Sequence, residues 1–437
     1  MSLIKSIQNR DTVLYVDEFS QADARAVKEY SRIVGRKIRV LIISNKKFNK
    51  VNIAESKGVV KHIRVNLDST KALAEALKPY KSRLLAALCK PERYLRDFQK
   101  IIPHVPYVMT PTPQSLEWTT DKIMMRRLID TVNTKLNPRF MVVSDGTQAT
   151  IDNVAKKIGF PLMVKPAGLA ASLLVQVCYH KDELEVSLKS TIKKVSNEYK
   201  KRNRTDTPQI LVEQMMEGPM YSIDSYVTAR GNTYHCPPVH VKTGRAIGFD
   251  DFFGYEQLTP VKLKKHKVEI AERVVDQTIL ALGLRNTTCH TELKKTEEGW
   301  KIIEITARRG GFRDDLYRMT YGINHALNDL LIRIPQRPIM PKKQLGYAVA
   351  MKFFARKEGT LEKITGIRKL RTLQSFESIE LRKKSGDECT FARNGGESVF
   401  NILMFNPIRS NLLADIRRLE KMVDIKVNPK GSKKKSL

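Results

Sequence analysis

Cysteine is scarce in this sequence, and it never occurs in the patterns that bind metals or form disulfides. The 437 residues contain five scattered cysteines and no Cys-x-x-Cys pair. An odd, dispersed set argues against a disulfide framework or a structural zinc site and favours a reducing compartment. No run approaches the ~18 consecutive apolar residues of a membrane span, and the first residues lack the apolar core of a signal peptide. The sequence therefore predicts a cytoplasmic protein without membrane contact.

Acidic residues are few relative to basic ones. Lysine and arginine number 78 against 46 aspartates and glutamates, which gives a formal net charge of +32. Such a balance attracts nucleic acid, anionic surfaces and acidic small molecules. The basic residues are spread along the chain without zinc-finger spacing, a basic zipper or an RNA-recognition signature, so a solvated basic surface is favoured over specific recognition. Non-specific nucleic-acid binding stays open, and the basic tail at residues 430–437 is predicted to be disordered.

The N-terminal part lacks a Gly-x-Gly-x-x-Gly motif, which argues against a dinucleotide site. It alternates apolar strands, such as "TVLYVDE" and "KIRVLIISN", with amphipathic helices. That alternation predicts an α/β domain at residues 1–115, built on a parallel sheet that is covered on both faces.

Later segments predict two further domains. Helices and paired strands indicate a second domain at residues 116–335, with a small lobe at about 139–209. Strands followed by one helix indicate a third, α+β domain at 336–429. The stretch at 236–260 shows no clear periodicity, and we expect it to be an irregular loop that selects substrate, because loops on a rigid scaffold carry specificity. Arg245 is the substrate-binding candidate in that loop.

The stretch "CHTELKKTEEGWKIIEITARRGG" has two alternating segments around a polar turn, which predicts a β-hairpin. A symmetric hairpin sets Glu292 directly opposite Glu304, with Thr306 on the same face. Like charges placed opposite each other destabilise a sheet, so we expect a cation between the two carboxylates. Two carboxylates and a hydroxyl oxygen suit Mg²⁺, which completes its octahedron with phosphate oxygens and water. A plain solvated hairpin is the alternative interpretation.

Other segments suit a phosphorylated ligand. Lys165 ends an apolar strand and precedes the small residues "AGLAAS", where a point charge and accessible backbone N–H groups can bind phosphate. Arg308 and Arg309 follow the hairpin and could stabilise a developing phosphoryl or acyl-phosphate anion. The strand in "ILVEQMMEG" runs through Glu213 into a Gly-Pro turn, a hinge at which backbone groups could hold a heteroaromatic base. Taken singly, each segment also fits ordinary surface or connector structure.

In chain order these segments resemble the ATP-grasp superfamily, from about Asp121 to Ala326. The order is Asp121 with the lysine after it, Lys165 with its small-residue loop, Glu213 with the hinge "EGPMYSID", then "HTELK" and "EITARRGG". The last two segments look closest to carboxylate–amine ligases of the L-amino-acid ligase type. The resemblance implies an ATP-grasp fold with an N-terminal parallel-sheet domain, a small mobile lobe and a C-terminal α+β domain.

The resemblance also implies roles for the matching residues, with ATP and Mg²⁺ as cofactors. Lys122 and Lys165 would bind the phosphates, under a loop that contains Gly168 and Ser172. Adenine would be bound by Glu213, Gln214 and Met215, and the metal by Glu292, Glu304 and Thr306. Arg308 and Lys165 would be the catalytic residues, and His290 would contact the substrate.

Departures from the family pattern bear on this assignment. Thr306 stands where the family commonly has asparagine, which puts a second Mg²⁺ in doubt. Met220 replaces the hinge acid that holds the ribose, so either Tyr221 or Asp224 takes over or the ribose is held loosely. Arg309 replaces a proline beside the substrate and favours an acidic one. The phosphate loop is also poor in glycine.

The function implied is an ATP-dependent ligase. A substrate carboxylate attacks the γ-phosphate to give an acyl phosphate and ADP, and an amine then displaces phosphate. The implied partners are ATP, a small carboxylic acid or amino acid, and an amine, with a homodimer left open. Two alternatives remain: an ATP-grasp carboxylase or kinase-like enzyme with another phosphoryl acceptor, and a non-catalytic nucleotide- or nucleic-acid-binding protein. The net charge and the departures at Thr306 and Met220 motivate the second alternative.

Overall fold

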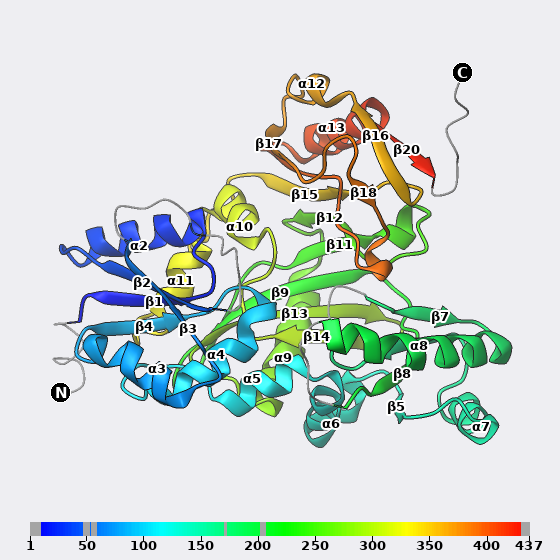
Figure 1. The fold of residues 1–437 in the computed structure, drawn as a ribbon. Coiled ribbons are helices and arrows are strands. Elements are labelled where there is room, and N and C mark those ends of the chain that lie inside the picture. Colours follow the sequence, from blue (N-terminus) through cyan, green and yellow to red (C-terminus); the bar gives the residue numbers. More distant parts are fainter. Residues whose placement is uncertain (1–9, 47–52, 54–58, 170–172, 202–206, 430–437) are drawn as a thin grey trace.

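The N-terminal region of the computed structural model is a parallel sheet in the order β3-β2-β1-β4 (Figure 1). The structure describes residues 10–46, 53, 59–169, 173–201 and 207–429. All four strands that the sequence predicts here are present, so the predicted parallel-sheet domain is confirmed. Its strands and helices are β1 (Thr12–Val16), β2 (Arg39–Asn45), β3 (Val59–Val65), β4 (Leu84–Leu88), α2 (Gln21–Ile33), α3 (Thr70–Leu77) and α4 (Leu95–Ile101).

Local sequence explains these elements. Every residue of β1 and β4 is buried, as expected for parallel strands covered on both faces. Helix α2 begins at a capping box, in which the Ser20 and Asp23 side chains each accept a hydrogen bond from the other's backbone N–H. The cap holds the Asp23 carboxylate at the edge of the domain.

The small lobe is a separate antiparallel sheet in the order β5-β8-β6-β7, at the right of Figure 1. Its own apolar cluster includes Val154, Val164 and Val212. The lobe begins with β5 at Phe140 and ends with β8 at Gln214. Its elements are β5 (Phe140–Val143), α7 (Gln148–Lys157), β6 (Leu162–Pro166), β7 (Gln176–Cys178), α8 (Lys181–Lys201) and β8 (Ile210–Gln214).

A nine-stranded antiparallel sheet forms the middle of the molecule (Figure 1). Its order is β14-β13-β9-β11-β12-β15-β19-β17, and β10 pairs with β9. One apolar cluster joins it to the N-terminal domain, from Leu14 through Phe98 to Ile305. The strands are β9 (Met220–Val227), β10 (Thr233–His235), β11 (Val239–Thr243), β12 (Gly254–Thr259), β13 (Thr287–Thr296), β14 (Gly299–Thr306), β15 (Tyr347–Phe353), β17 (Phe376–Leu381) and β19 (Phe400–Asn406).

The predicted boundary at residue 335 does not separate two sheets, because β12 pairs with β15 across it. The later segment also forms a small sheet in the order β18-β16-β20, with β16 (Gly359–Thr365), β18 (Glu388–Cys389) and β20 (Asp424–Pro429). Two helices, α12 (Ile367–Leu370) and α13 (Arg409–Met422), accompany it. The remaining helices are α5 (Pro113–Thr120), α6 (Lys122–Asn133), α9 (Lys265–Ala281), α10 (Arg313–Tyr321) and α11 (His325–Leu331).

One sequence-based expectation was wrong in this region. The stretch at 236–260, expected to be an irregular loop, contains strands β11 and β12 of the central sheet. Helix α10 ends at Gly322, whose φ of 71° lets the chain take a new direction before α11. Helix α11 then packs against the N-terminal domain through Ala326, Leu327 and Leu330.

The five cysteines are buried, and none of them forms a disulfide. Within the described ranges, no helix is both long and apolar enough to cross a membrane.

Candidate active site

The β13–β14 hairpin brings two carboxylates together. Glu292 lies directly opposite Glu304, and His290 lies opposite Thr306. A register shift follows at Leu293, so the symmetric pairing predicted from the sequence holds at the end of the hairpin that carries the acids. The side chains of Glu292 and Glu304 are 31% and 25% exposed, which leaves both carboxylates accessible to a ligand.

A lysine and a histidine of the protein lie next to the Glu304 and Glu292 carboxylates. The Lys122 Nζ lies 2.8 Å from Glu304 Oε1 and donates to the Leu169 carbonyl at 2.9 Å. His290 Nε2 lies 3.4 Å from Glu292 Oε1. Burial opposes a charge on Lys122, but the Glu304 carboxylate outweighs it, so the pKa of Lys122 is raised. At Glu304, a lysine therefore already supplies positive charge of the kind that the sequence leads us to expect beside the two carboxylates.

The hairpin has the donor set of a magnesium site. The Thr306 Oγ1 is buried and has no hydrogen-bond partner in the described part of the chain, on the strand that carries Glu304. The described residues contain no group of three or more His, Cys, Asp or Glu side chains arranged for a metal. Mg²⁺ commonly takes one or two carboxylates and draws its remaining ligands from phosphate and water. Glu292 and Glu304 thus fit a metal that arrives with a nucleotide.

Lys165 belongs to a buried ion network at the base of the small lobe. Its Nζ contacts Glu213 Oε2, and Arg126 Nε donates to Glu213 Oε1 at 2.6 Å. Burial raises the pKa of Glu213, but Arg126 and Lys165 outweigh it and lower that pKa to about 2. The Glu213 carboxylate is therefore occupied by two cations, and its expected contact with adenine is wrong.

Arg126 was missed by the sequence analysis. It lies four residues after Lys122 in α6, so both side chains project from one helix face, and this spacing was the available signal. Its guanidinium also donates to the carbonyls of Ile302 and Ile303, which connects α6 to the β13–β14 hairpin.

The hinge offers fewer free backbone donors than expected. The Gln214 N–H donates to the Arg139 carbonyl at 2.8 Å, and the Met215 N–H donates to the Pro161 carbonyl at 3.0 Å. Each backbone unit carries one N–H, so neither amide is free to donate to a base, and that part of the adenine assignment is wrong. Their side chains are partly exposed.

The phosphate loop is described only in part. Gly168 N–H donates to the Tyr199 hydroxyl of α8 at 3.1 Å. Leu169 is buried against Tyr199 in a small apolar cluster. The predicted phosphate ligand Ser172 lies outside the described residues.

Arg308 follows the hairpin, and its side chain contacts the N-terminal domain. Its Nη2 donates to Glu92 Oε2 at 2.9 Å, from the short helix Glu92–Tyr94. Burial raises the pKa of Glu92, but Arg308 and Lys122 outweigh it, so that pKa is lowered. Glu92 gave no sequence signal, because its partner is 216 residues away. The pair leaves Arg308 next to the carboxylates of the hairpin.

Arg309 does not face a substrate. It is buried and contacts the carboxylates of Asp23, Asp314 and Asp329. Burial opposes its charge, but these three acids outweigh it and raise the pKa of the guanidinium. The expectation that Arg309 selects an acidic substrate is therefore wrong. Its guanidinium instead pairs with carboxylates of α2, α10 and α11 and so connects these helices.

His290 rests on a fully buried acid. The Asp224 carboxylate contacts His290 Nδ1 at 2.6 Å and His325 Nε2 at 2.8 Å, and it accepts the Gly310 N–H at 2.8 Å. Asp224 is thus unavailable to a ribose, and Tyr221, buried against the Trp300 ring, is unavailable too. Burial disfavours the charged imidazole, but Asp224 outweighs it and raises the pKa of His290. This network orients His290 toward Glu292.

Arg245 lies at the junction of the small lobe and the central sheet. Its Nη2 donates to the Tyr179 hydroxyl at 2.5 Å, Nη1 lies 3.6 Å from Asp250, and the guanidinium stacks over Phe252. These contacts connect β7 with the β11–β12 connection, and none of them involves the hairpin acids.

Two further cations beside the hairpin were missed. Arg313, the first residue of α10, donates to Gln257 Oε1 at 2.7 Å and Ser222 Oγ at 2.6 Å. Lys352 of β15 lies with its Nζ 5.6 Å from the centre of the Phe312 ring. Burial lowers the pKa of Lys352, opposed by Glu292 and reinforced by Arg313 and Arg308. A lone lysine in the apolar strand "YAVAMKF" was the available signal.

Comparisons with known proteins agree with this geometry. Residues 158–313 match the ATP-grasp domain. The "Uncharacterized protein y4rH" of Sinorhizobium fredii (strain NBRC 101917 / NGR234) is 27% identical over 326 residues. The match covers 73% of this chain, and the chain spans 63% of the length of that relative.

Solved structures share the fold along nearly the whole chain. The L-amino acid ligase from Bacillus licheniformis superposes with a TM-score of 0.78 at 18% identity, covering 96% of this chain and 99% of that one. Phosphoribosylglycinamide synthetase from Anaerococcus prevotii gives 0.65 at 15% identity, covering 96% and 100%. The biotin carboxylase domain of 2-oxoglutarate carboxylase from Hydrogenobacter thermophilus, solved with MgADP and bicarbonate, gives 0.63 at 15% identity, covering 95% and 90%.

Residues 158–313, which match the ATP-grasp domain, include Glu213 and the hairpin acids Glu292 and Glu304. The chain contains an ATP-grasp domain on the fold shared with these ligases and carboxylases, as the order of its sequence motifs predicts.

Proposed function

We propose that the chain is an ATP-dependent ligase that joins a carboxylate to an amine. The observation that carries the proposal is the direct pairing of Glu292 with Glu304, with the Lys122 ammonium 2.8 Å from Glu304. Accessible carboxylates beside a half-buried ammonium suit a metal–triphosphate complex, because the metal neutralises phosphate charge and the lysine binds a phosphate oxygen.

In this proposal Lys122 and Lys165 bind the phosphates. Glu292 and Glu304, with the Thr306 hydroxyl as a candidate neighbour, hold Mg²⁺. The metal would neutralise charge on the transferred phosphoryl group. Glu213 and Arg126 position Lys165, since a lysine clamped by a buried carboxylate loses few rotamers when ATP binds. We also propose that the lobe at about 139–209 moves as a unit and closes on the nucleotide.

The first step transfers a phosphoryl group to a carboxylate. A substrate carboxylate oxygen attacks the γ-phosphorus, the bond to the bridging oxygen breaks, and ADP leaves. The amine nitrogen of the second substrate then attacks the acyl carbon, phosphate leaves, and the nitrogen loses a proton. Arg308, Arg313 and Lys352 supply positive potential for the carboxylate and for the acyl phosphate.

His290 has a positioning role in this proposal. Its Nδ1 is fixed by Asp224 while its Nε2 faces Glu292, so it holds one metal-binding carboxylate in place. The five unpaired cysteines suit a reducing compartment, and we propose that the reaction takes place in the cytoplasm.

Phosphate release from ATP and Mg²⁺ tests the proposal across a matrix of amino acids, small carboxylic acids and amines. Release that needs both a carboxylate and an amine, with a condensed product of matching mass, is the expected result. Release driven by bicarbonate alone would instead assign a carboxylase-type reaction. Salt-sensitive RNA binding without turnover for any pair would contradict a ligase.

A further inference from the structure

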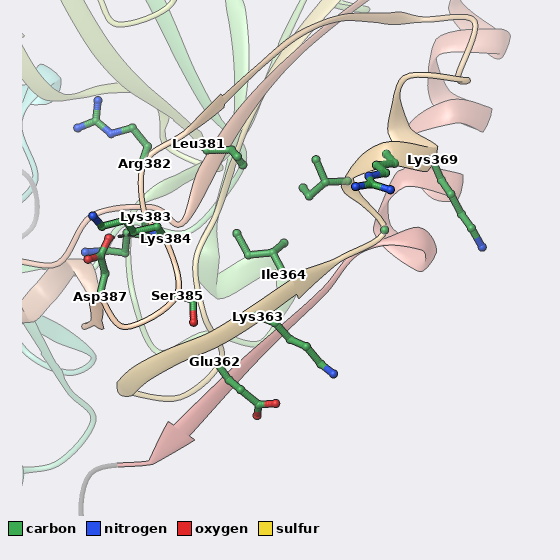
Figure 2. A pocket seen from close by; sticks show the side chains of 13 residues that line it. Glu362, Lys363, Ile364, Lys369, Leu381, Arg382, Lys383, Lys384, Ser385 and Asp387 are labelled. Carbon is green, nitrogen blue, oxygen red and sulfur yellow. Dashed lines mark hydrogen bonds between the residues drawn. The ribbon is translucent and has the colours of Figure 1, made fainter.

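A second candidate site lies in the C-terminal segment, away from the hairpin. A groove of about 910 Å³ opens between the end of β16 with α12 and the connection that follows β17. Figure 2 shows Lys363 and Lys369 on one side of it and Arg382, Lys383 and Lys384 on the other. None of the proposed nucleotide or substrate residues lines this groove.

The residues that line the groove carry an excess of positive charge. Six of its thirteen lining residues are basic and two are acidic. Arg382 is offset by Glu380 and Glu397, each at 3.1 Å. The remaining five cations form no ion pair with any residue in the described ranges: Lys363, Arg368, Lys369, Lys383 and Lys384. Unpaired cations around one concavity attract an anionic partner.

The floor of the groove is aliphatic. Ile364, Ile367 and Leu381 line it, and Leu381 is 57% exposed, so its side chain is open to a partner. The lining contains no aromatic residue. Single-stranded nucleic acid is normally held by bases stacked on aromatic side chains, so this floor is poorly suited to it. A free phosphate would need several donors converging on one point rather than cations spread around an apolar floor.

We infer that this groove binds an acidic polypeptide segment that carries aliphatic side chains. Carboxylates of the segment pair with the unpaired cations, and an aliphatic side chain covers Leu381 and Ile364. A second copy of this chain is a poor occupant, because a net charge of +32 on each copy opposes their association. The inference is independent of the reaction at the hairpin.

Fluorescence anisotropy with matched probes tests this inference. The probes are a labelled peptide of Glu-Glu-Leu repeats, the same peptide with Ser in place of Leu, and an oligothymidylate of equal net charge. We expect the leucine-containing peptide to bind most tightly. Leu381→Ser should weaken that peptide about fivefold and leave the serine peptide unchanged, because only the former covers the apolar floor.

Charge reversal provides the second arm. Lys363→Glu with Lys384→Glu, one from each wall, should weaken both peptides about tenfold at physiological salt. The matched control is Lys193→Glu with Lys194→Glu on α8, which changes the net charge equally at exposed positions. Thermal melting checks that each variant is folded, and substrate-dependent phosphate release should be unchanged in all of them.

Three results would overturn the inference. One is equal loss of peptide binding in the groove and control variants, which would indicate a generally basic surface. Another is oligothymidylate binding that is tighter than peptide binding and insensitive to Leu381→Ser. The third is self-association in sedimentation that the Lys363→Glu and Lys384→Glu changes abolish, which would make the groove a contact between copies.

Discussion

The Lys165 ammonium and the Glu213 carboxylate form a buried ion pair, and Arg126 binds the second oxygen of the same carboxylate. This arrangement places the buried Glu213 carboxylate beside the lysine that we assign to the phosphates. It also excludes the carboxylate from the adenine site. Removing the negative charge would leave two buried cations facing each other, which is far less favourable than losing an exposed ion pair.

Glu213→Gln should therefore destabilise the fold. We expect the free energy of unfolding to fall by about 3 kcal/mol, because Arg126 and Lys165 would lose the buried carboxylate that they share. Urea denaturation monitored by circular dichroism measures the change. The matched control is Glu217→Gln in the same hinge, which is exposed and should change the stability little. Equal stabilities for the two variants would contradict the network.

The same carboxylate predicts a pH dependence. The pKa of Glu213 is lowered from 4.5 to about 2 in the folded chain, so its contribution to stability is fully present above pH 4.5. That contribution is lost as the pH falls from 4.5 toward 2. The difference in unfolding free energy between the wild type and Glu213→Gln should shrink over this interval. A difference that stays constant from pH 6 to pH 3 would count against the assignment.

Local patterns predicted the parts of this molecule that depend on neighbours in sequence. Strand–helix alternation predicted the four parallel strands, and counting across the turn placed Glu292 opposite Glu304. Both follow from periodicity within a short segment. The match of residues 158–313 to the ATP-grasp domain agrees with the order of the motifs.

Contacts between distant segments could not be predicted in this way. Arg309 follows the β13–β14 hairpin and was expected to face a substrate, but its acidic partners include Asp23, which is 286 residues away. The hinge amides looked free because their acceptors, the Arg139 and Pro161 carbonyls, come from other strands and loops. Burial and pairing of a polar side chain depend on tertiary packing, which no single motif contains.

Glu304→Gln tests the metal assignment. Turnover should be nearly abolished, because the variant loses one of the two carboxylates proposed to hold Mg²⁺ at the triphosphate. Stability should fall modestly rather than rise, since Lys122 loses its charged partner. The control is Glu298→Gln in the turn of the same hairpin, which is exposed. Near-normal turnover in the Glu304 variant, with an unchanged Mg²⁺ requirement, would contradict the assignment of the metal site to this hairpin.

Arg309→Met should act on stability and not on substrate choice. It removes the cation shared by the buried carboxylates of Asp23 and Asp329 and the partly buried carboxylate of Asp314, and we expect a loss of about 3–5 kcal/mol in the free energy of unfolding. Arg309→Lys should recover part of this loss, because it keeps the charge. Arg318→Met, at an exposed position of α10, is the control. A changed ratio of activities toward acidic and neutral substrates in the lysine variant would restore the role in selection.

Closure of the small lobe is tested by hydrogen exchange. Amides at Ala167–Leu169 and in β6 should exchange more slowly when ATP and Mg²⁺ are added at saturating concentrations, because the lobe would shield the loop from water. Amides of β2 in the N-terminal sheet serve as the internal reference. Equal exchange of the loop with and without nucleotide would contradict a closing lobe.

Lys352→Met tests whether the last segment of the chain contributes to the substrate site. The Lys352 ammonium lies over the Phe312 ring, and its pKa is lowered by burial and by Arg313 and Arg308. The charged form is therefore disfavoured in the free protein, and a bound anion would stabilise it. The KM for the carboxylate substrate should rise about tenfold, the loss of one charge-assisted hydrogen bond.

The matched change, Lys357→Met, lies just beyond β15 at an exposed position and should leave every constant unaltered. The KM for ATP should stay within about twofold in the Lys352 variant, because the nucleotide is assigned to Lys122 and Lys165. If the KM for ATP rose and that for the carboxylate did not, Lys352 would belong to the phosphate site instead. If neither constant moved while stability rose, Lys352 would be a buried charge without a ligand, and the carboxylate would have to be held by Arg308 and Arg313 alone.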